Sequence, residues 1–561
     1  MAPGGRPEQA RRRRARALPL IVIAGAAFVV GAAAGAGGGS SDNGLARRFV
    51  GAWARGDYAA MYALLTPAAR GSVDAPTFQR DYEQAAATAT LIGLRGESPR
   101  SGPHGAVIIP ILVSTRVFGT LREPLTVPIG HQGSTTGVDW APRLVFPGLS
   151  PGETLTRRTR LGARASILAR DGRPLAAGTT RASAFGSAVT AVVGQLGPIP
   201  AAGREGFRAL GYPADAKIGS SGLEQAFEHQ LAGTPGGTLM AGGRAVASAK
   251  SVPGHAVRTT IDPAIQQAAE ASLSMLGGIA VLQPATGQVL ALAGLATDTQ
   301  PPGSTFKMVT TSAALEAHLV TLSSTFPFQD HSVLAGVTLG NASGETCGGT
   351  LLRAFADSCN SVFAPLGVRI GKAQLVRTAE HYGFNQPPDL RGTPESTIPQ
   401  PSKIGDDLDL GSTAIGQGNV VATPLEMALI AATIADGGRR PHLTLSADAT
   451  PRFVRAVSPR TAHLMTRMML EVVRSGTGTS AQITGVAVAG KTGTAELEAT
   501  QGPTATGGDN FTKTDAWFAA FAPAAKPRVA IGVLFVRAGA GGQTAAPVAH
   551  DVLLTALHRP L

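Results

Sequence analysis

The stretch Pro301-Pro302-Gly303-Ser304-Thr305-Phe306-Lys307 opens a predicted helical run from Met308 to Leu319. Ser304 and Lys307 are three positions apart, so their side chains share one helix face, one turn apart. A serine hydroxyl becomes a nucleophile when a neighbouring base takes its proton, and a desolvated lysine can be that base. The helix N-terminus also directs backbone N–H groups at a developing oxyanion. Alone, the stretch is equally compatible with an ordinary surface helix.

Two further motifs follow along the chain. Ser358-Cys359-Asn360 places a hydroxyl and an amide two residues apart on a predicted loop, suited to proton relay and to holding a substrate amide. Lys491-Thr492-Gly493-Thr494 is predicted to be a strand that binds an extended peptide edge-on and offers Lys491 and hydroxyls to its terminal carboxylate. Gly493 would let the substrate backbone lie close. In this order, the three motifs indicate acyl transfer through Ser304.

The elements around these motifs form a regular pattern. Asp262-Pro263 marks a helix start within Thr259–Leu273. A turn at Pro284–Gly287 separates two strand-like runs, and two more runs and a helix end the chain: Gly278–Leu282, Gln288–Ala293, Asp515–Phe521, Val529–Phe535 and Ala546–Leu557. Strands at both ends of one domain predict a sheet assembled from distant parts of the sequence.

The N-terminal half has a different character. Leu45, Phe49 and Trp53 recur at the spacing of one helix face, and Asp57 is a predicted N-cap of a second helix. The β-branched runs Ala106–Val117 and Leu121–Ile129 follow, which predicts an α+β domain that closes near Trp140. We expect Trp53 and Trp140 to be core residues. Residues 150–251 predict an extended, partly strand-built connector with a helical patch near Leu223–Leu231.

Composition narrows the function classes. Of 561 residues, 43% are hydrophobic and 15% charged, which argues against a disordered chain. The net charge of +12 comes partly from arginines before Leu18–Ala36, and the remaining excess is spread thinly, so no nucleic-acid partner is expected. Leu18–Ala36 is an uncharged run long enough to span a bilayer, and a cleaved signal peptide is the alternative. Both a retained anchor and a cleaved signal peptide would place the rest of the chain outside the cytoplasm.

Two cysteines, Cys347 and Cys359, leave two alternatives open: a disulfide across a short loop, or two partly buried thiols. The histidines are scattered and no Cys/His cluster has zinc-site spacing, so neither a metal nor a cofactor is expected. Trp517 follows the third motif on a predicted neighbouring strand, and it is assigned equally to the core and to the wall of the site.

The chain resembles class B, monofunctional penicillin-binding proteins over nearly its whole length. The resemblance rests on the three motifs and on further stretches of the last domain: Thr259–Pro263, Ala414–Gly418, Ala422–Leu425, Lys491–Glu496 and Asp515–Phe518. Residues 43–145 resemble the NTF2-like domain of low-affinity, resistance-type members, and residues 150–250, including Gly222-Leu223-Glu224, are similar to the dimerisation or pedestal region.

This resemblance implies a multidomain α+β protein whose last domain is an antiparallel sheet flanked by helices. The expected order is a basic cytoplasmic tail (1–17), a transmembrane anchor (18–36), a linker (37–42), an NTF2-like domain (43–149), a pedestal (150–254) and a transpeptidase domain (255–561). The NTF2-like domain occupies the place of a glycosyltransferase domain, so glycan polymerisation would need a separate membrane partner. That domain itself would be a spacer or a docking surface for other wall-synthesis proteins.

The resemblance also implies residue roles. The catalytic set would be Ser304 as the acylated nucleophile, Lys307 as its base, Ser358 and Asn360 for proton transfer and substrate contact, and Lys491. Lys491, Thr492 and Thr494 would bind the terminal carboxylate beside Gly493, and the backbone amides of Ser304 and Thr494 would form the oxyanion hole. Cys359 takes the place of the Asp in the Ser-Asp-Asn motif of penicillin-binding proteins and class A β-lactamases, and the flanking Ser358 and Asn360 still supply the reactive groups.

These expectations describe a single-pass membrane enzyme, exposed outside the cell, that cross-links peptidoglycan stem peptides and is acylated by β-lactams. A D,D-carboxypeptidase would carry the same motifs. A serine β-lactamase would need an extra base for fast deacylation, which we cannot assign, and a β-lactam or muropeptide sensor would carry more spans or a long cytoplasmic domain.

Overall fold

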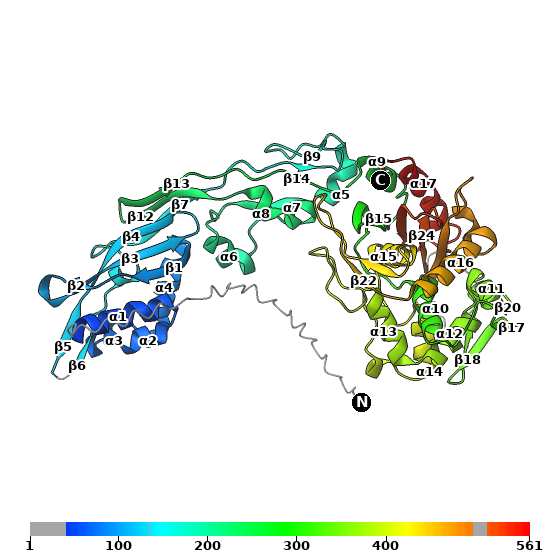
Figure 1. The fold of residues 1–561 in the computed structure, drawn as a ribbon, viewed down its shortest axis with the longest axis horizontal. Helices are drawn as coiled ribbons and strands as arrows, with labels where there is room; N and C mark the ends of the chain where they lie inside the picture. Colours follow the sequence, from blue (N-terminus) through cyan, green and yellow to red (C-terminus); the bar gives the residue numbers. More distant parts are fainter. Residues whose placement is uncertain (1–40, 134, 497–512) are drawn as a thin grey trace, which may run out of the picture. The chain divides into compact units, whose positions relative to one another are not determined.

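The structure, a computed structural model, describes residues 41–133, 135–496 and 513–561, which form two compact units (Figure 1). The first unit contains the described residues up to Leu161 with Ile199–Ala216 and Thr234–Val252, and the second contains Gly162–Pro198, Lys217–Gly233 and Pro253–Leu561. The predicted connector is therefore divided between the units. The predicted anchor, 18–36, lies outside the described residues, among which no helix is long and apolar enough to span a membrane.

The first unit begins with helices, as predicted. They are α1 (Ser41–Ala54), α2 (Tyr58–Ala63), α3 (Pro67–Ser72) and α4 (Ala75–Ala89). Leu45, Phe49 and Trp53 lie on the buried face of α1, and the Asp57 side chain caps α2 by accepting from the N–H of Ala60. Helix α1 starts at Ser41, inside the predicted linker 37–42, because its buried face already begins at Leu45 and needs a preceding turn.

Antiparallel strands complete this unit. One sheet contains β1 (Leu91–Gly96), β2 (Arg100–Ser101), β3 (Val107–Thr115) and β4 (Gly119–Val127). A second sheet contains β7 (Leu155–Arg160), β12 (Gly236–Ala241) and β13 (Arg244–Ala249). The unit also contains the hairpin of β5 (Ile129–Gln132) and β6 (Thr135–Val138) and the helix α6 (Arg204–Ala209). Alternate residues of β3 are buried. Trp53 and Trp140 are core residues, as expected: the Trp53 ring packs 5.1 Å from that of Tyr82, and Trp140 Nε1 donates to the Tyr82 hydroxyl at 3.2 Å.

The second unit is built around a five-stranded antiparallel sheet. Its order is β16 (Gln288–Gly294), β15 (Gly277–Gln283), β25 (Val529–Phe535), β24 (Thr514–Ala522) and β23 (Ala489–Glu496). The four predicted strand runs are confirmed, and the sheet joins strands from both ends of the domain. β23 lies at one edge of the sheet.

Helices cover both faces of this sheet (Figure 1). Along β24, Trp517, Ala519 and Phe521 face one hydrophobic cluster while Phe518 and Ala520 face another, as the two-residue period of a strand requires. The first cluster includes α10 (Lys307–Glu316), α15 (Pro424–Ala435) and α16 (Pro459–Ser475), and the second includes α9 (Pro263–Ala271) and α17 (Ala545–Leu557). Asp262 caps α9, so the predicted helix start is confirmed.

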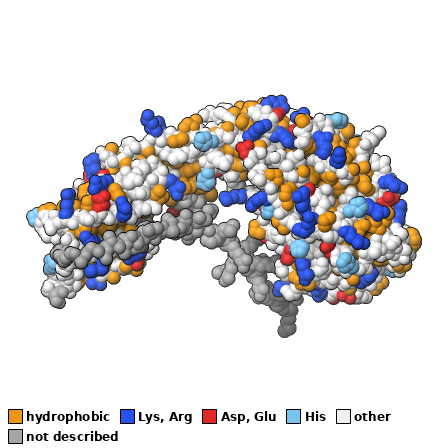
Figure 2. Space-filling model, viewed as in Figure 1, with side chains coloured by type: hydrophobic (Ala, Val, Ile, Leu, Met, Phe, Trp, Pro, Cys, Tyr) orange, Lys and Arg blue, Asp and Glu red, His pale blue; other side chains and the backbone are white. Residues whose placement is uncertain are grey.

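Shorter elements complete the unit. Before the sheet lie β8 (Ile167–Leu168), β9 (Pro174–Ala176), α5 (Thr190–Val193), β10 (Leu196–Pro198), β11 (Lys217–Gly219), α7 (Gly222–Ala226), α8 (Glu228–Ala232) and β14 (Val257–Arg258). Between β16 and β23 in the sequence lie β17 (Thr325–Gln329), β18 (His331–Leu334), β19 (Val337–Gly340), β20 (Cys347–Thr350), α11 (Leu351–Ala356), α12 (Asn360–Ile370), α13 (Lys372–Tyr382), α14 (Asp407–Ala414), β21 (Arg439–Pro441) and β22 (Phe453–Arg455). On the face drawn in Figure 2, Lys and Arg side chains are scattered among other residues.

Candidate active site

The structure brings the three motifs together. Ser304 lies in the 3-10 turn η5 (Gly303–Phe306), and Lys307 begins α10 directly after it. Ser358 lies between α11 and α12 with a left-handed backbone, φ 63°, a conformation that a non-glycine residue adopts at a local cost. Asn360 is the first residue of α12 and not part of a loop, which corrects the expectation for this residue. The left-handed turn at Ser358 is what lets α11 end and α12 begin two residues later.

The Lys307 amino group is completely buried among polar partners. Its Nζ lies 2.8 Å from Ser304 Oγ, 2.6 Å from the Ser358 carbonyl oxygen and 2.6 Å from Asn360 Oδ1. A neutral amine has two hydrogens and one lone pair. The carbonyl and the amide oxygen can only accept, so they take the two hydrogens and leave the lone pair for the Ser304 hydroxyl. This arrangement suits removal of the Ser304 proton.

Lys491 approaches the same group from β23. Its Nζ donates to Ser358 Oγ at 2.8 Å and to the Thr492 carbonyl at 3.0 Å, and Ser358 Oγ also lies 3.3 Å from Lys307 Nζ. Both lysines are fully buried. Two buried cations that share one hydroxyl would repel each other, so the arrangement favours having at least one of them neutral.

The electrostatics agree with this conclusion. Burial, followed by the nearby charge of Lys491, holds the pKa of Lys307 well below its ordinary value. Burial also lowers the pKa of Lys491 to about 7, although Asp357 acts in the opposite direction. At neutral pH, therefore, Lys307 is set to be the base and Lys491 remains close to its own titration point.

The edge strand β23 lies directly against the turn that carries Ser304. A Cβ on Gly303, whose φ is +51°, would come within 2.5 Å of the Thr494 carbonyl oxygen. This brings the Ser304 turn and the Thr494 backbone together, as an oxyanion hole shared between them requires. Gly416 supports the turn from another side: its carbonyl accepts from the Gly303 N–H at 3.0 Å.

Gly493 of β23 lies against the turn that carries the nucleophile. A Cβ there would lie 2.9 Å from the Pro302 carbonyl oxygen and 3.0 Å from Thr305 Cγ2. The glycine therefore makes room for the nucleophile turn of the chain itself. It also packs against Trp517, which is fully buried and belongs to the core.

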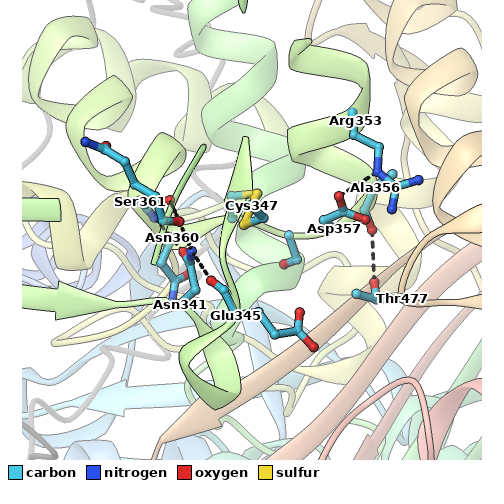
Figure 3. Close-up of a disulfide and its surroundings, with 12 residues drawn as sticks. Asn341, Glu345, Cys347, Arg353, Ala356, Asp357, Asn360, Ser361 and Thr477 are labelled. Carbon is cyan, nitrogen blue, oxygen red and sulfur yellow. Dashed lines mark hydrogen bonds and ion pairs between the residues drawn. A yellow bond between two sulfur atoms is a disulfide. The ribbon is translucent and has the colours of Figure 1, made fainter. Parts of the chain in front are cut away.

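The second motif is fixed by covalent and polar contacts (Figure 3). Cys359 forms a disulfide with Cys347 of β20, which decides between the two alternatives for the cysteines. Asn341 accepts from the Ser361 N–H at 2.8 Å and donates to the Glu345 carbonyl at 2.7 Å. The Asn360 amide donates to the Gly340 carbonyl at 2.9 Å. Asn360 therefore has its amide oxygen turned toward Lys307.

Sequence reasoning missed the supporting residues of the site. Gly303 and Gly416 carry no reactive group, and only their places beside Ser304 and within Ala414–Gly418 could have marked them. Asn341 and Thr477, whose hydroxyl lies 2.5 Å from that of Thr492, had no local signal at all. Among the described residues, no carboxylate hydrogen-bonds to Ser304 or Lys307, and no cluster of His, Cys, Asp and Glu could hold a metal ion.

Comparison with known families covers most of the chain. Residues 277–554 match the penicillin-binding protein transpeptidase domain, 175–259 the penicillin-binding protein dimerisation domain, and 42–153 the NTF2-like N-terminal transpeptidase domain.

Individual relatives agree with these matches. The peptidoglycan D,D-transpeptidase PbpA of Mycolicibacterium smegmatis is 33% identical over 426 residues, covering 63% of this chain and 81% of that protein. PbpA of Mycobacterium tuberculosis is 36% identical over 379 residues, covering 54% and 73%. The M. tuberculosis penicillin-binding protein A structure matches at a TM-score of 0.57 and 28% identity over 71% of this chain and 99% of that one. The penicillin G acyl-enzyme of the same protein matches at 0.57 and 29%, over 71% and 100%. The chain therefore belongs to the penicillin-binding protein transpeptidases, as a class B member with an NTF2-like domain and a dimerisation domain.

Proposed function

We propose that this chain cross-links peptidoglycan as a serine D,D-transpeptidase in which Ser304 is acylated by a stem peptide or by a β-lactam. The observation that carries the proposal is the contact set of the buried Lys307, whose lone pair is left facing Ser304 Oγ at 2.8 Å. The names of the relatives and the acyl-enzyme complex of the related structure support the same chemistry.

In the first half-reaction, Lys307 Nζ takes the Ser304 proton while Oγ bonds to the carbonyl carbon of the penultimate D-Ala. The negative charge that forms on the carbonyl oxygen is held by the backbone N–H groups of Ser304 and Thr494. The C–N bond then breaks, and the leaving amine takes a proton from the Ser358 hydroxyl. Lys307 and Lys491, at 3.3 and 2.8 Å from Ser358 Oγ, can return that proton to it.

The substrate carboxylate belongs beside β23. An extended peptide can add to this sheet edge, with Thr492 and Thr494 hydroxyls and the Lys491 charge available to its terminal carboxylate. Asn360, whose amide is oriented by Lys307 and Gly340, contacts the peptide on the acyl side. Gly493 contributes by letting the nucleophile turn approach β23.

In the second half-reaction, an amine of another stem peptide attacks the acyl-serine. Its proton passes to Lys307, directly or through the Ser358 hydroxyl, and Lys307 gives a proton to Ser304 Oγ as the ester bond breaks and the new amide is left. Because no described carboxylate contacts Ser304, hydrolysis by water lacks a dedicated base, which favours transfer and a long-lived β-lactam adduct.

The remaining parts of the chain suggest where this happens. The run 18–36 would anchor the protein in the cell membrane with the catalytic domain outside. Residues 43–149 would be a spacer or docking domain, 150–254 a pedestal or dimerisation region, and 255–561 the transpeptidase domain. Glycan polymerisation would come from a separate membrane protein. Accessibility of Lys403, an exposed surface lysine, to an impermeant amine reagent on intact cells tests this orientation.

The proposed function is tested by labelling the detergent-solubilised full chain with a fluorescent penicillin. We expect a label on the wild type that persists for many minutes and is absent from Ser304→Ala. Ser323→Ala, at an exposed serine, is the matched control and should label normally. A label lost within seconds would indicate a β-lactamase, and a label retained by Ser304→Ala would contradict the assignment of the nucleophile. Release of D-Ala with transfer to an added amine separates transpeptidase from carboxypeptidase.

A further inference from the structure

A short loop between α16 and β23 contacts both the second and the third motif. Thr477 Oγ1 lies 2.5 Å from Thr492 Oγ1. The Thr477 hydroxyl also donates to the Ala356 carbonyl at 3.3 Å, and the Thr477 N–H donates to the same carbonyl at 3.1 Å (Figure 3). Ala356 is the last residue of α11, two positions before Ser358. One threonine thus connects the end of α11 to the strand that carries Lys491 and Thr492.

The position of this loop is enforced by close backbone approaches. A Cβ on Gly476 would collide with the Ala356 carbonyl, and one on Gly542 would collide with the Thr477 carbonyl. The two glycines let the loop lie between α11 and the segment after β25. The Thr477 side chain nevertheless remains exposed, whereas Thr492 is 5% exposed. Thr477 therefore stands at the open side of the proposed carboxylate site.

Counting hydrogens shows why this contact matters. At 2.5 Å, one of the two hydroxyls must donate to the other. If Thr492 donates to Thr477, the Thr492 hydrogen is not available to a substrate. If Thr477 donates to Thr492, the Thr492 hydrogen is free to point at a carboxylate. The Ala356 carbonyl already receives the Thr477 N–H, so the Thr477 hydroxyl can leave it at little cost.

We propose that Thr477 is a positioning residue for recognition of the terminal carboxylate. When a carboxylate binds, Thr477 turns its hydrogen to Thr492 Oγ1, and Thr492 donates to the anion. A hydroxyl that itself receives a hydrogen bond is a stronger donor, and the bond to an anion is the stronger kind. This proposal rests on the proposed function, in which Thr492 contacts the carboxylate.

The test compares a ligand with a free carboxylate with one in which it is masked. Acylation rates of the full chain are measured with benzylpenicillin and with its methyl ester, for wild type, Thr477→Val and Thr477→Ser. Valine matches threonine in shape and lacks the hydroxyl. We expect Thr477→Val to slow acylation by the free acid about tenfold while the ester rate changes less than about twofold. Thr477→Ser should restore most of the rate.

Two controls separate the possible failures. Thr479→Val, at an exposed threonine two positions further on, should leave both rates unchanged. Equal slowing of acid and ester in Thr477→Val, or no slowing of either, would overturn the positioning role. Thr492→Val is measured alongside: if it also fails to distinguish acid from ester, the carboxylate site itself is misassigned. Melting curves of the variants identify any loss from misfolding.

Discussion

The two units of the chain bury different kinds of polar residue. In the first unit the described buried polar residues are threonines, at positions 66, 88, 90 and 115. The second unit buries charged groups, including Lys307, Lys491, Asp262 and Asp515. Burying an ionisable group costs free energy unless partners compensate, so it is normally avoided. Among the described residues the first unit buries no charged side chain, whereas the second buries several, and two of them, Lys307 and Lys491, lie at the active site.

Left-handed residues occur in both units, Thr90 and His104 in the first among them, but in the second unit two of them lie at the active site. Gly303 directly precedes the nucleophile, and the Ser358 carbonyl accepts from Lys307 Nζ. Such conformations persist only where surrounding contacts over-determine them. In this unit the contacts are the disulfide at Cys359 and the close packing of Gly303 on Thr494. Changes to these contacts should affect acylation, and comparable changes in the first unit should not.

The largest effect is expected from Gly303→Ala. An added Cβ would meet the Thr494 carbonyl at 2.5 Å and would hold a positive φ that alanine disfavours. The turn must then move away from β23, separating Ser304 from the Thr494 N–H. Loss of one oxyanion donor costs about 10²- to 10³-fold in rate. The rate of fluorescent-penicillin labelling measures this loss, and a rate within threefold of wild type would contradict it.

Gly71→Ala is the matched change in the first unit. Gly71 lies in α3 with open space around its Cβ position. Alanine is the better helix former by about 0.5–1 kcal/mol, so this variant should be as stable as wild type or slightly more stable. Its labelling rate should not change.

The next effect is expected from Lys491→Met. Losing the Lys491 charge removes one of the causes that lower the pKa of Lys307. The Lys307 pKa then rises, the protonated form persists to higher pH, and the acidic limb of the acylation profile moves to higher pH. Because Ser358 also loses its partner, the plateau rate should fall about 10²-fold. Lys403→Met is the surface control. If the acidic limb of the Lys491→Met profile stays at the wild-type pH, the charge of Lys491 does not influence the pKa of Lys307.

Part of the fold and of the active site can be predicted from the sequence. The sheet strands were identifiable because their apolar runs are short and bounded by turn residues such as Pro284–Gly287. The three motifs were identifiable because each is a local pattern. The bond from Thr477 to Ala356 joins residues 121 positions apart, and no local pattern records it. The contact of Gly493 with the nucleophile turn was missed for the same reason: a glycine indicates that another group lies close, but not which one.

The division of the connector was also beyond the sequence. Residues 150–251 were predicted as one extended segment, yet β7 pairs with β12 inside the first unit while β8 pairs with β14 inside the second. Short strands without a strong apolar face carry little information about their partners.

A smaller effect, on stability, is expected from Cys347→Ser. The disulfide to Cys359 closes a loop of 12 residues, and such a link contributes about 3 kcal/mol in the chain-entropy account. The melting transition of the second unit should fall by several degrees, while that of the first unit, which has no described cysteine, stays constant. Scanning calorimetry with and without reductant measures this, and reductant should not affect the variant. Equal shifts in both melting transitions would contradict the conclusion that the disulfide stabilises the second unit alone.

The smallest effects are expected from substitutions of two buried tryptophans, Trp140 in the first unit and Trp517 in the second. Trp140→Phe removes the donor to the Tyr82 hydroxyl, which is buried, so the first unit should lose about 1–2 kcal/mol while labelling is unchanged. Trp517 Nε1 has no hydrogen-bond partner within the described residues, so Trp517→Phe forfeits no such bond. Its smaller side chain leaves a void beneath Gly493, so labelling should slow a few-fold and the second unit should melt at a lower temperature. Slower labelling by Trp140→Phe, or unchanged labelling by Trp517→Phe, would contradict this difference between the units.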